Sequence, residues 1–132
     1  MRERPRLAVL IGAPHRGDAS MHNDLIAMYD ALQTRGLGSE EFLSLEGNLD
    51  RQMLMSFLKE VGHRMALWRV GELFLYFSGH GFFVGDTVEN ARVGVKLQDA
   101  HQEMAEYHVY WDEMLCALAI PAAVTCTMLP DH

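Results

Sequence analysis

The sequence contains little that is typical of secreted, membrane or nucleic-acid-binding proteins. Its 132 residues include only two cysteines, Cys116 and Cys126, too few for a disulfide framework and without metal-ligand spacing. Basic residues are a minority, 11 Lys and Arg against 18 Asp and Glu, and no basic cluster is interleaved with aromatic residues, so a nucleic-acid partner is not expected. No apolar run reaches the length of a membrane span, and the first apolar stretch is short for a signal peptide. We therefore expect a cytoplasmic protein with no membrane partner.

Several common catalytic motifs are also missing. The Gly-x-Ser-x-Gly turn of α/β-hydrolases is absent around Ser78, no Gly-x-Gly-x-x-Gly follows the first apolar stretch, and His-Glu-x-x-His does not occur. The pairs His15/His22 and His101/His108 have no accompanying cluster of ligands and indicate surface histidines. The sequence therefore predicts no metal site and no other cofactor.

What the sequence does contain is the alternation of an α/β protein. With 49% apolar and 22% charged residues it has the composition of a globular chain, and its length suits a single domain over residues 1–132. Strands are predicted at residues 7–11, 41–45, 73–77 and 122–129. Helices are predicted after Ser20, after Asn48 or Asp50, and from Trp111 to Ala119. This order predicts an α/β fold with a mostly parallel sheet.

Two further segments allow detailed predictions. The second helix has an apolar stripe that we expect to pack in the core, formed by Met53, Leu54, Phe57, Leu58 and Val61. The segment from Phe82 to Leu97 is predicted to form a hairpin or excursion, with its turn at Gly85–Asp86.

The most informative segment ends on a histidine between two glycines. Leu73–Phe77 suits a buried parallel strand, and Gly79 and Gly81 allow a sharp turn and a close backbone approach. His80 is thereby placed at the carboxyl end of a strand, where open α/β sheets form their sites. Residue type and spacing alone leave two interpretations open, a catalytic histidine or one held by the backbone of a tight loop.

One catalytic pair consistent with this position is a histidine and a cysteine thiolate at adjacent strand ends. Cys126 is the candidate thiol, but it falls in the middle of the predicted fourth strand, where a small buried apolar residue is the simpler interpretation. Cys116, inside the predicted last helix, is expected to be buried for the same reason.

The segment Tyr76–Gly81, preceded by Leu-Phe-Leu, resembles the histidine motif of the caspase and metacaspase superfamily of cysteine endopeptidases. Leu7–Gly12 is similar to the first strand of that family, and His22–Asp24 is similar to the Asn-Asp motif that opens its first helix. Gly36–Leu37 resembles the turn into strand two, and Trp111–Leu118 resembles the helix before the nucleophile strand. The resemblance covers nearly the whole chain, with Ser-Gly-His-Gly as its specific part. It implies a caspase-like three-layer sandwich.

The resemblance also implies roles for individual residues. His80 would be the general base, and backbone N–H groups around Gly81 would contribute to the oxyanion hole. Asp24, Ser78 and Asp131 match the residues that line the S1 pocket of metacaspases. Carboxylates in that pocket bind arginine or lysine at P1, the residue before the cleaved bond.

Two points of the comparison leave alternatives. Caspases proper select aspartate with an arginine in S1, a role for which Arg16 could be argued, although Asp24 favours a basic P1. The family motif Asp-x-Cys-x-Ser-Gly fits Asp131-His132, with the nucleophile as the next residue. Aligning Cys126 instead would place Thr127-Met128-Leu129 where a small, turn-forming Ser-Gly belongs, so we prefer the first alignment.

On the preferred alignment, the fourth strand would be an apolar edge and the sheet would be incomplete at its C-terminal side. A C-terminal small-subunit-like segment or a partner chain would then complete it. The function expected from the resemblance is hydrolysis of protein or peptide substrates by a His/Cys dyad, with basic P1 favoured. The alternatives are a catalytically dead pseudo-peptidase that acts as a scaffold or regulatory partner, and, ranked last, a flavodoxin-like domain that binds a ligand at the loop 12–18.

Overall fold

The computed structural model describes residues 5–13, 20–84, 92–97 and 108–131. Its larger sheet has four strands, all parallel, in the order β2-β1-β3-β7. These strands are β1 (Arg6–Gly12), β2 (Phe42–Glu46), β3 (Gly71–Ser78) and β7 (Val124–Asp131). The helices are α1 (Ser20–Thr34), α2 (Arg51–Met65), α3 (Trp111–Leu118) and the short 3-10 helix η1 (Ser39–Glu41). The predicted α/β fold with a parallel sheet is confirmed.

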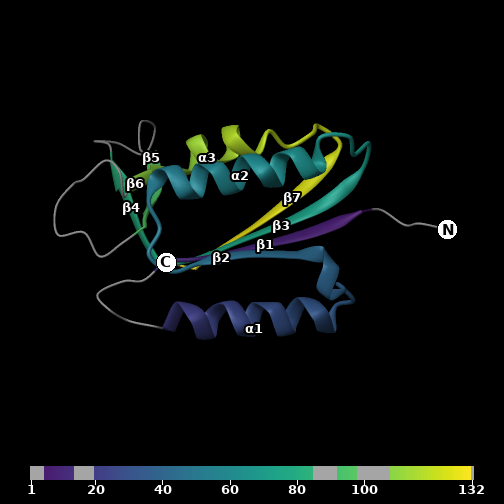
Figure 1. The fold of residues 1–132 in the computed structure, drawn as a ribbon, viewed down its shortest axis with the longest axis horizontal. Coiled ribbons are helices and arrows are strands. Elements are labelled where there is room, and N and C mark those ends of the chain that lie inside the picture. The colour runs from purple at the N-terminus through teal and green to yellow at the C-terminus, as the bar shows by residue number, and fades with distance from the viewer. Residues whose placement is uncertain (1–4, 14–19, 85–91, 98–107, 132) are drawn as a thin grey trace.

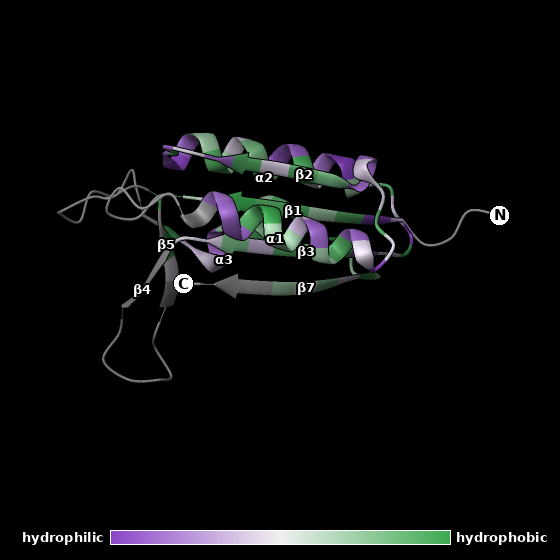
Figure 2. Cartoon of the chain, turned by 90° about the horizontal axis from the view of Figure 1, so that it is seen from below, coloured by the Kyte–Doolittle hydropathy of each residue, from purple (hydrophilic) through white to green (hydrophobic). Residues whose placement is uncertain are grey.

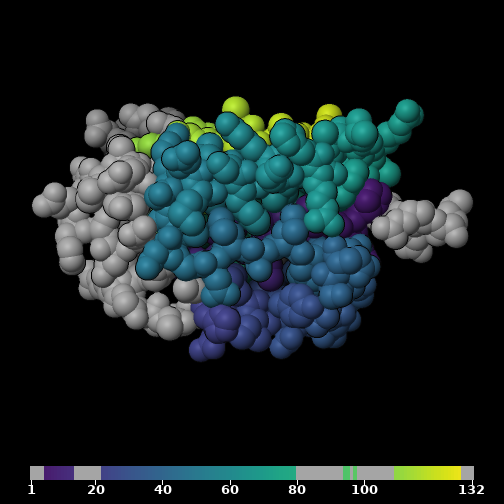
Figure 3. All heavy atoms as spheres, viewed as in Figure 1, coloured from purple at the N-terminus to yellow at the C-terminus, as the bar shows by residue number. Residues whose placement is uncertain are grey.

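The helices cover the larger sheet from both sides. Helix α1 lies on one face and helices α2 and α3 lie on the other, which gives three layers (Figure 1). Seen from the α1 side, α1 runs lengthwise along the middle of the sheet over β1 and β3, where apolar residues predominate (Figure 2). From the side of β2, residues of α1, β2 and α2 leave only small parts of β1 visible (Figure 3). β1 and β3 are therefore the central strands of the domain.

The alternation of side chains along the strands separates two hydrophobic cores. In β1, Leu7, Val9 and Ile11 contribute to the larger core beneath α2 and α3, whereas Ala8 and Leu10 contribute to the smaller core beneath α1. The larger core also takes four apolar side chains of α2, namely Leu54, Leu58, Val61 and Met65. The smaller core contains Leu25, Leu32, Leu37 and Tyr76 besides the two residues of β1.

Local hydrogen bonds explain where the helices begin and end. Asp50 caps α2 by accepting a hydrogen bond from the backbone N–H of Met53 at 2.8 Å, as the sequence predicted. Helix α1 ends in a Schellman motif: Gly36 has a φ of +104°, and the N–H of Leu37 donates to the carbonyl of Leu32. Glycine is needed at position 36 because other residues rarely adopt a positive φ.

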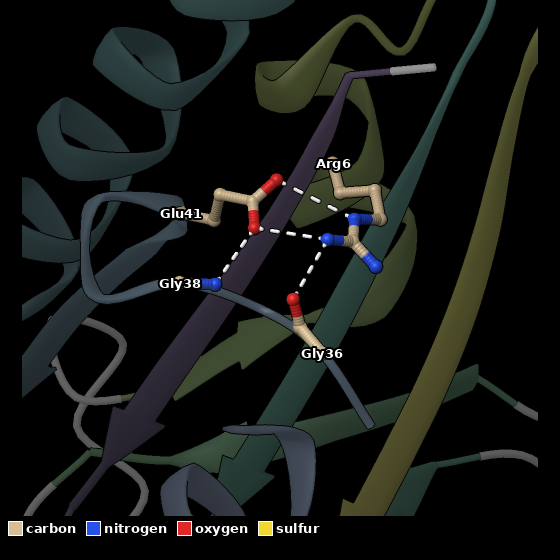
Figure 4. A network of polar contacts seen from close by, with 4 residues as sticks. All are labelled: Arg6, Gly36, Gly38 and Glu41. Carbon is tan, nitrogen blue, oxygen red and sulfur yellow. Dashed lines mark hydrogen bonds and ion pairs between the residues drawn. The ribbon is translucent and has the colours of Figure 1, made fainter. Parts of the chain in front are cut away.

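A polar network holds the connection from α1 to β2 against the start of β1 (Figure 4). Arg6 donates to the two carboxylate oxygens of Glu41 at 3.2 and 3.4 Å and to the carbonyl of Gly36 at 2.9 Å. Glu41 also accepts a hydrogen bond from the N–H of Gly38 at 2.8 Å. The network lies at the amino end of β1, opposite the end that carries the candidate site.

A second, antiparallel sheet lies at the carboxyl end of the larger one (Figure 1). It comprises β4 (His80–Val84), β5 (Arg92–Lys96) and β6 (His108–Tyr110), in the order β4-β5-β6. The pairing of β4 with β5 confirms the predicted hairpin, while the predicted turn at Gly85–Asp86 lies outside the described residues. Strand β6 was not predicted because three residues are too few to show an alternating pattern.

Three details of the sequence prediction are wrong. Met53 is 46% exposed instead of buried, because it lies beside the buried stripe of α2, which begins at Leu54 and continues to Met65. Cys116 is exposed on the outer side of α3. The last strand begins at Val124 and not at residue 122, because Ala122 and Ala123 form a turn after Pro121. Among the described residues, no helix has the length and hydropathy needed to cross a membrane.

Candidate active site at the carboxyl edge of the sheet

The four parallel strands end in one row of register partners. Glu46 of β2 pairs with Gly12 of β1, Gly12 pairs with Ser78 of β3, and Ser78 pairs with Asp131 of β7. Neighbouring strands are about 4.8 Å apart, so the row spans about 14 Å. Three of the four positions carry polar residues at the edge where open α/β sheets form their sites.

Ser78 lies inside this row, between Gly12 and Asp131. Ser78 is 3% exposed, and among the residues whose burial the structure describes it is the one polar residue that is buried. Its hydroxyl donates a hydrogen bond to Oδ2 of Asp24, in the second turn of α1, at 2.7 Å. The bond satisfies a buried hydroxyl and joins α1 to the end of β3 through a charged acceptor, the stronger kind of hydrogen bond.

The structure therefore brings together the three residues expected to line an S1 pocket. Asp24 contacts Ser78 directly, and Asp131 is the register partner of Ser78 on the neighbouring strand. They come from α1, β3 and β7, segments far apart in the chain. Parallel pairing aligns the carboxyl ends of β3 and β7, which is why residues 53 positions apart become neighbours.

His80 and Gly81 are the first two residues of β4, with Gly79 alone between β3 and β4. A Cβ on Gly79 would lie 2.7 Å from the Phe77 ring and 3.2 Å from the carbonyl of Ala13. The glycine before His80 is thus required by a close approach, as expected from the sequence. The N–H of Ala13 also donates to the carbonyl of Ser78 at 2.9 Å, which ties the chain after β1 to this bend.

Neither cysteine belongs to the row of register partners at the carboxyl edge. Cys126 pairs with Leu73 in the middle of the sheet, five positions before Asp131, and is thus about 16 Å back along β7. Burial raises the pKa of its thiol, which opposes formation of a thiolate. Cys126 packs against the larger core, as the simpler interpretation of the sequence predicted. Cys116 lies on α3 and is exposed.

The structure adds one pair that the sequence prediction missed. His22 in the first turn of α1 lies with its Nδ1 2.8 Å from Oε2 and 3.1 Å from Oε1 of Glu46. Glu46 is the β2 member of the carboxyl-edge row. Glu46 directly follows a predicted strand, and this position was the signal in the sequence that could have pointed to it. The contact with His22 could not be predicted, because the strand order that places β2 beside β1 cannot be read from the sequence.

Other predicted features cannot be placed. Arg16, His15 and His101 lie outside the described residues, as does most of the loop 12–18 that the flavodoxin-like alternative requires. Among the described residues, no group of three or more His, Cys, Asp or Glu side chains has an arrangement that could hold a metal ion.

Comparison with known proteins adds no relative. No protein-family model matches the chain, and no curated protein matches it either. The resemblance to caspases and metacaspases therefore depends on the motifs in the sequence alone.

Proposed function

We propose that the chain is the large-subunit-like part of a caspase-like cysteine endopeptidase that cleaves after arginine or lysine. His80 acts as general base, the backbone N–H of Gly81 stabilises the oxyanion, and Asp24, Ser78 and Asp131 form the S1 pocket. The observation that carries the proposal is the hydrogen bond from Ser78 to Asp24 beside the last residue of β7. Three residues chosen by motif resemblance from distant segments are neighbours next to the proposed base.

The pocket suits a basic side chain. Ser78 has one proton to donate, and it fixes the Asp24 carboxylate from one side while both carboxylate oxygens can accept further hydrogen bonds. Asp131 adds a second acidic residue at the neighbouring strand end. A guanidinium can form two parallel hydrogen bonds to a carboxylate, and an ammonium group gains the charge interaction alone. We therefore expect arginine to be preferred over lysine, and both over aspartate.

The proposed reaction is peptide hydrolysis through an acyl-enzyme. His80 takes the proton of the thiol, the thiolate attacks the carbonyl carbon, and the N–H of Gly81 donates to the oxyanion. Protonated His80 then gives its proton to the leaving amine as the C–N bond breaks, which leaves a thioester. His80 next deprotonates a water molecule, which attacks the thioester and returns the thiol.

The nucleophile in this proposal is a cysteine that follows Asp131-His132 in the chain. Cys126 does not serve, because it lies about 16 Å back along β7 and because burial favours its neutral form. A C-terminal small-subunit-like segment or a partner chain would pair with β7, which has β3 as its one neighbour in the described sheet.

The position of Cys126, far from the proposed base, also favours a second function. If no cysteine follows His132, the domain is a pseudo-peptidase that uses its S1-like pocket to hold a basic segment of a partner protein. The coding sequence after His132 separates the two functions directly.

The catalytic proposal is tested with fluorogenic peptides that carry arginine, lysine or aspartate at P1. The protein used is the full product of the gene, whether or not it extends past His132. We expect cleavage after arginine and lysine, abolished by His80→Ala. Asp24→Asn, which keeps the shape but removes the charge, should lower kcat/KM for the arginine peptide about 10- to 100-fold, the range for a hydrogen bond to a charged group.

Asp30→Asn is the matched control, because Asp30 is an exposed acid on the same helix. Its kcat/KM should equal that of the unmodified protein. Cleavage only after aspartate would contradict the S1 assignment, and cleavage that survives His80→Ala would contradict the role of the base.

A further inference from the structure

We propose that His22 and Glu46 form a positioning pair that fixes the orientation of Asp24 towards Ser78. This inference rests on the proposed function, because it assigns a role to the pair in substrate selection at the S1 pocket. The two hydrogen-bonded pairs lie side by side in the structure, since Glu46 and Ser78 are the register partners on either side of Gly12.

The geometry of α1 places the two hydrogen-bonded pairs on opposite sides of the helix axis. His22 and Asp24 are two residues apart, so they project about 200° apart around the helix axis. His22 contacts Glu46 on β2, whereas Asp24 accepts the hydrogen bond of Ser78 on β3. A single contact would leave the first turns free to rotate about it. Two contacts on opposite sides of the axis oppose that rotation and so hold the Asp24 carboxylate in place.

Residues 22–24 at the start of α1 are not buried in either core. His22 and Asn23 are exposed, and Asp24 is half-buried. From residue 22 onward, Leu25 is the first side chain of the helix that is buried in the smaller core. The described side-chain contacts of residues 22–24 with the sheet are polar, that of His22 with Glu46 and that of Asp24 with Ser78.

The exposure of His22 and Glu46 to solvent determines how much this pair contributes to binding of a basic side chain. The His22 side chain is 57% exposed and that of Glu46 is 35% exposed, so solvent screens their interaction. Pairs of this kind contribute little on their own, and we expect their loss to weaken binding of a basic side chain about two- to fivefold. Loss of Asp24 itself should have a larger effect, because that residue contacts the ligand.

The experiment measures binding of two peptides to the chain by calorimetry or NMR titration. One peptide ends in arginine amide and the other has norleucine in its place, which keeps the apolar stem but lacks the charge. We expect His22→Ala and Glu46→Ala each to weaken the arginine peptide about two- to fivefold and to leave the norleucine peptide unchanged. The double variant should be no weaker than either single variant, and Glu46→Gln, which keeps an acceptor for His22, should recover most of the loss.

A second measurement does not require a ligand. The ¹³C NMR resonance of the Asp24 carboxylate should shift in His22→Ala and stay unchanged in His63→Ala. His63 is the matched control because it forms an exposed histidine–glutamate pair with Glu60, at 3.9 Å, on the outside of α2.

The outcomes separate the two proposals. If the unmodified chain binds both peptides equally, the S1 assignment is wrong and the role of the pair in selection falls with it. If the unmodified chain prefers arginine but His22→Ala and Glu46→Ala keep that preference and the Asp24 resonance, the S1 assignment stands and the positioning role is wrong. An equal loss for both peptides would also overturn the positioning role, because it would indicate general loosening of the site.

Discussion

Cys116 and Cys126 show how strongly the surroundings of a single side chain decide its chemistry. The two thiols belong to the same small chain, yet Cys116 is exposed on α3 whereas Cys126 lies on β7 against the larger core. Burial raises the pKa of Cys126, so at a given pH a smaller fraction of it is the reactive thiolate.

We expect Cys116 to react with a thiol reagent at pH 8 at least about ten times faster than Cys126. Raising the pH towards the elevated pKa of Cys126 should narrow the difference, since its thiolate fraction then increases. Mass spectrometry of digested samples gives the rate at each cysteine. In urea the two rates should converge, and comparable rates in the folded protein would show that Cys126 is not protected.

At this scale the candidate site was only partly predictable. The motif resemblance identified Asp24, Ser78 and Asp131, and the structure places them together. The contact between His22 and Glu46 could not be predicted, because it depends on β2 lying beside β1 and on the rotation of α1. Exposure of Cys116 was missed because a short helix offers few positions from which to tell its buried side from its outer side.

At the scale of elements, the sequence of α2 accounts for both where the helix begins and which side of it is buried. It begins at the Asp50 cap and buries a continuous stripe against the sheet. It also approaches α3 very closely: a Cβ on Gly62 would lie 2.4 Å from the carbonyl of Leu118. The starts of the two helices are linked by an ion pair between Arg51 and Glu113, whose hydrogen bond raises the pKa of Arg51.

Replacing the cap should measurably weaken α2. Asp50→Ala leaves the N–H of Met53 without its side-chain acceptor and is expected to lower the free energy of unfolding by about 1 kcal/mol. Asp50→Asn keeps an acceptor oxygen and should cost only a few tenths of that. Urea denaturation of the three proteins measures the differences. Equal losses in both variants would indicate that the charge of Asp50, and not its hydrogen bond, stabilises the helix.

The elements themselves were predictable because each carries a strong local pattern. The alternation of apolar strands and amphipathic helices gave the parallel sheet, and Asp50 and Gly36 marked helix ends through cap chemistry and positive φ. The order of strands within the sheet was not predictable, because it depends on long-range pairing. The second sheet was recognised only as a hairpin, since β6 contributes three residues.

For the molecule as a whole, the two faces of the larger sheet are unequally covered. The face beneath α2 and α3 holds most of the buried apolar residues and is joined by Val95, Leu97 and Val109 from the region of the smaller sheet. On the opposite face α1 is the one helix in the described part of the chain, and it contributes Leu25 and Leu32 to a core of six buried residues. Fewer buried contacts mean a lower free energy for local opening.

We therefore expect the amides of α1 to exchange hydrogen through a lower-energy opening than those of α2, β1 and β3. Native-state hydrogen exchange followed by NMR at increasing urea measures these energies residue by residue. Leu25→Ala should lower protection in α1 while leaving that of α2 nearly unchanged. A single exchange energy shared by α1 and the central strands would show that the two faces unfold as one unit.

Gly79 alone separates β3 of the larger sheet from β4 of the smaller one, and β6 leads back to the larger sheet through α3 and β7. Two Cα–Cα steps of 3.8 Å allow Ser78 and His80 to be at most about 7 Å apart, however the smaller sheet is oriented. The residues expected to line the pocket belong to α1, β3 and β7, whereas the proposed base begins β4 of the smaller sheet, which buries Val95 and Val109 in the larger core. The chain itself thus limits how far the proposed base can lie from Ser78, and the packing of the smaller sheet on the larger core limits how the base can turn.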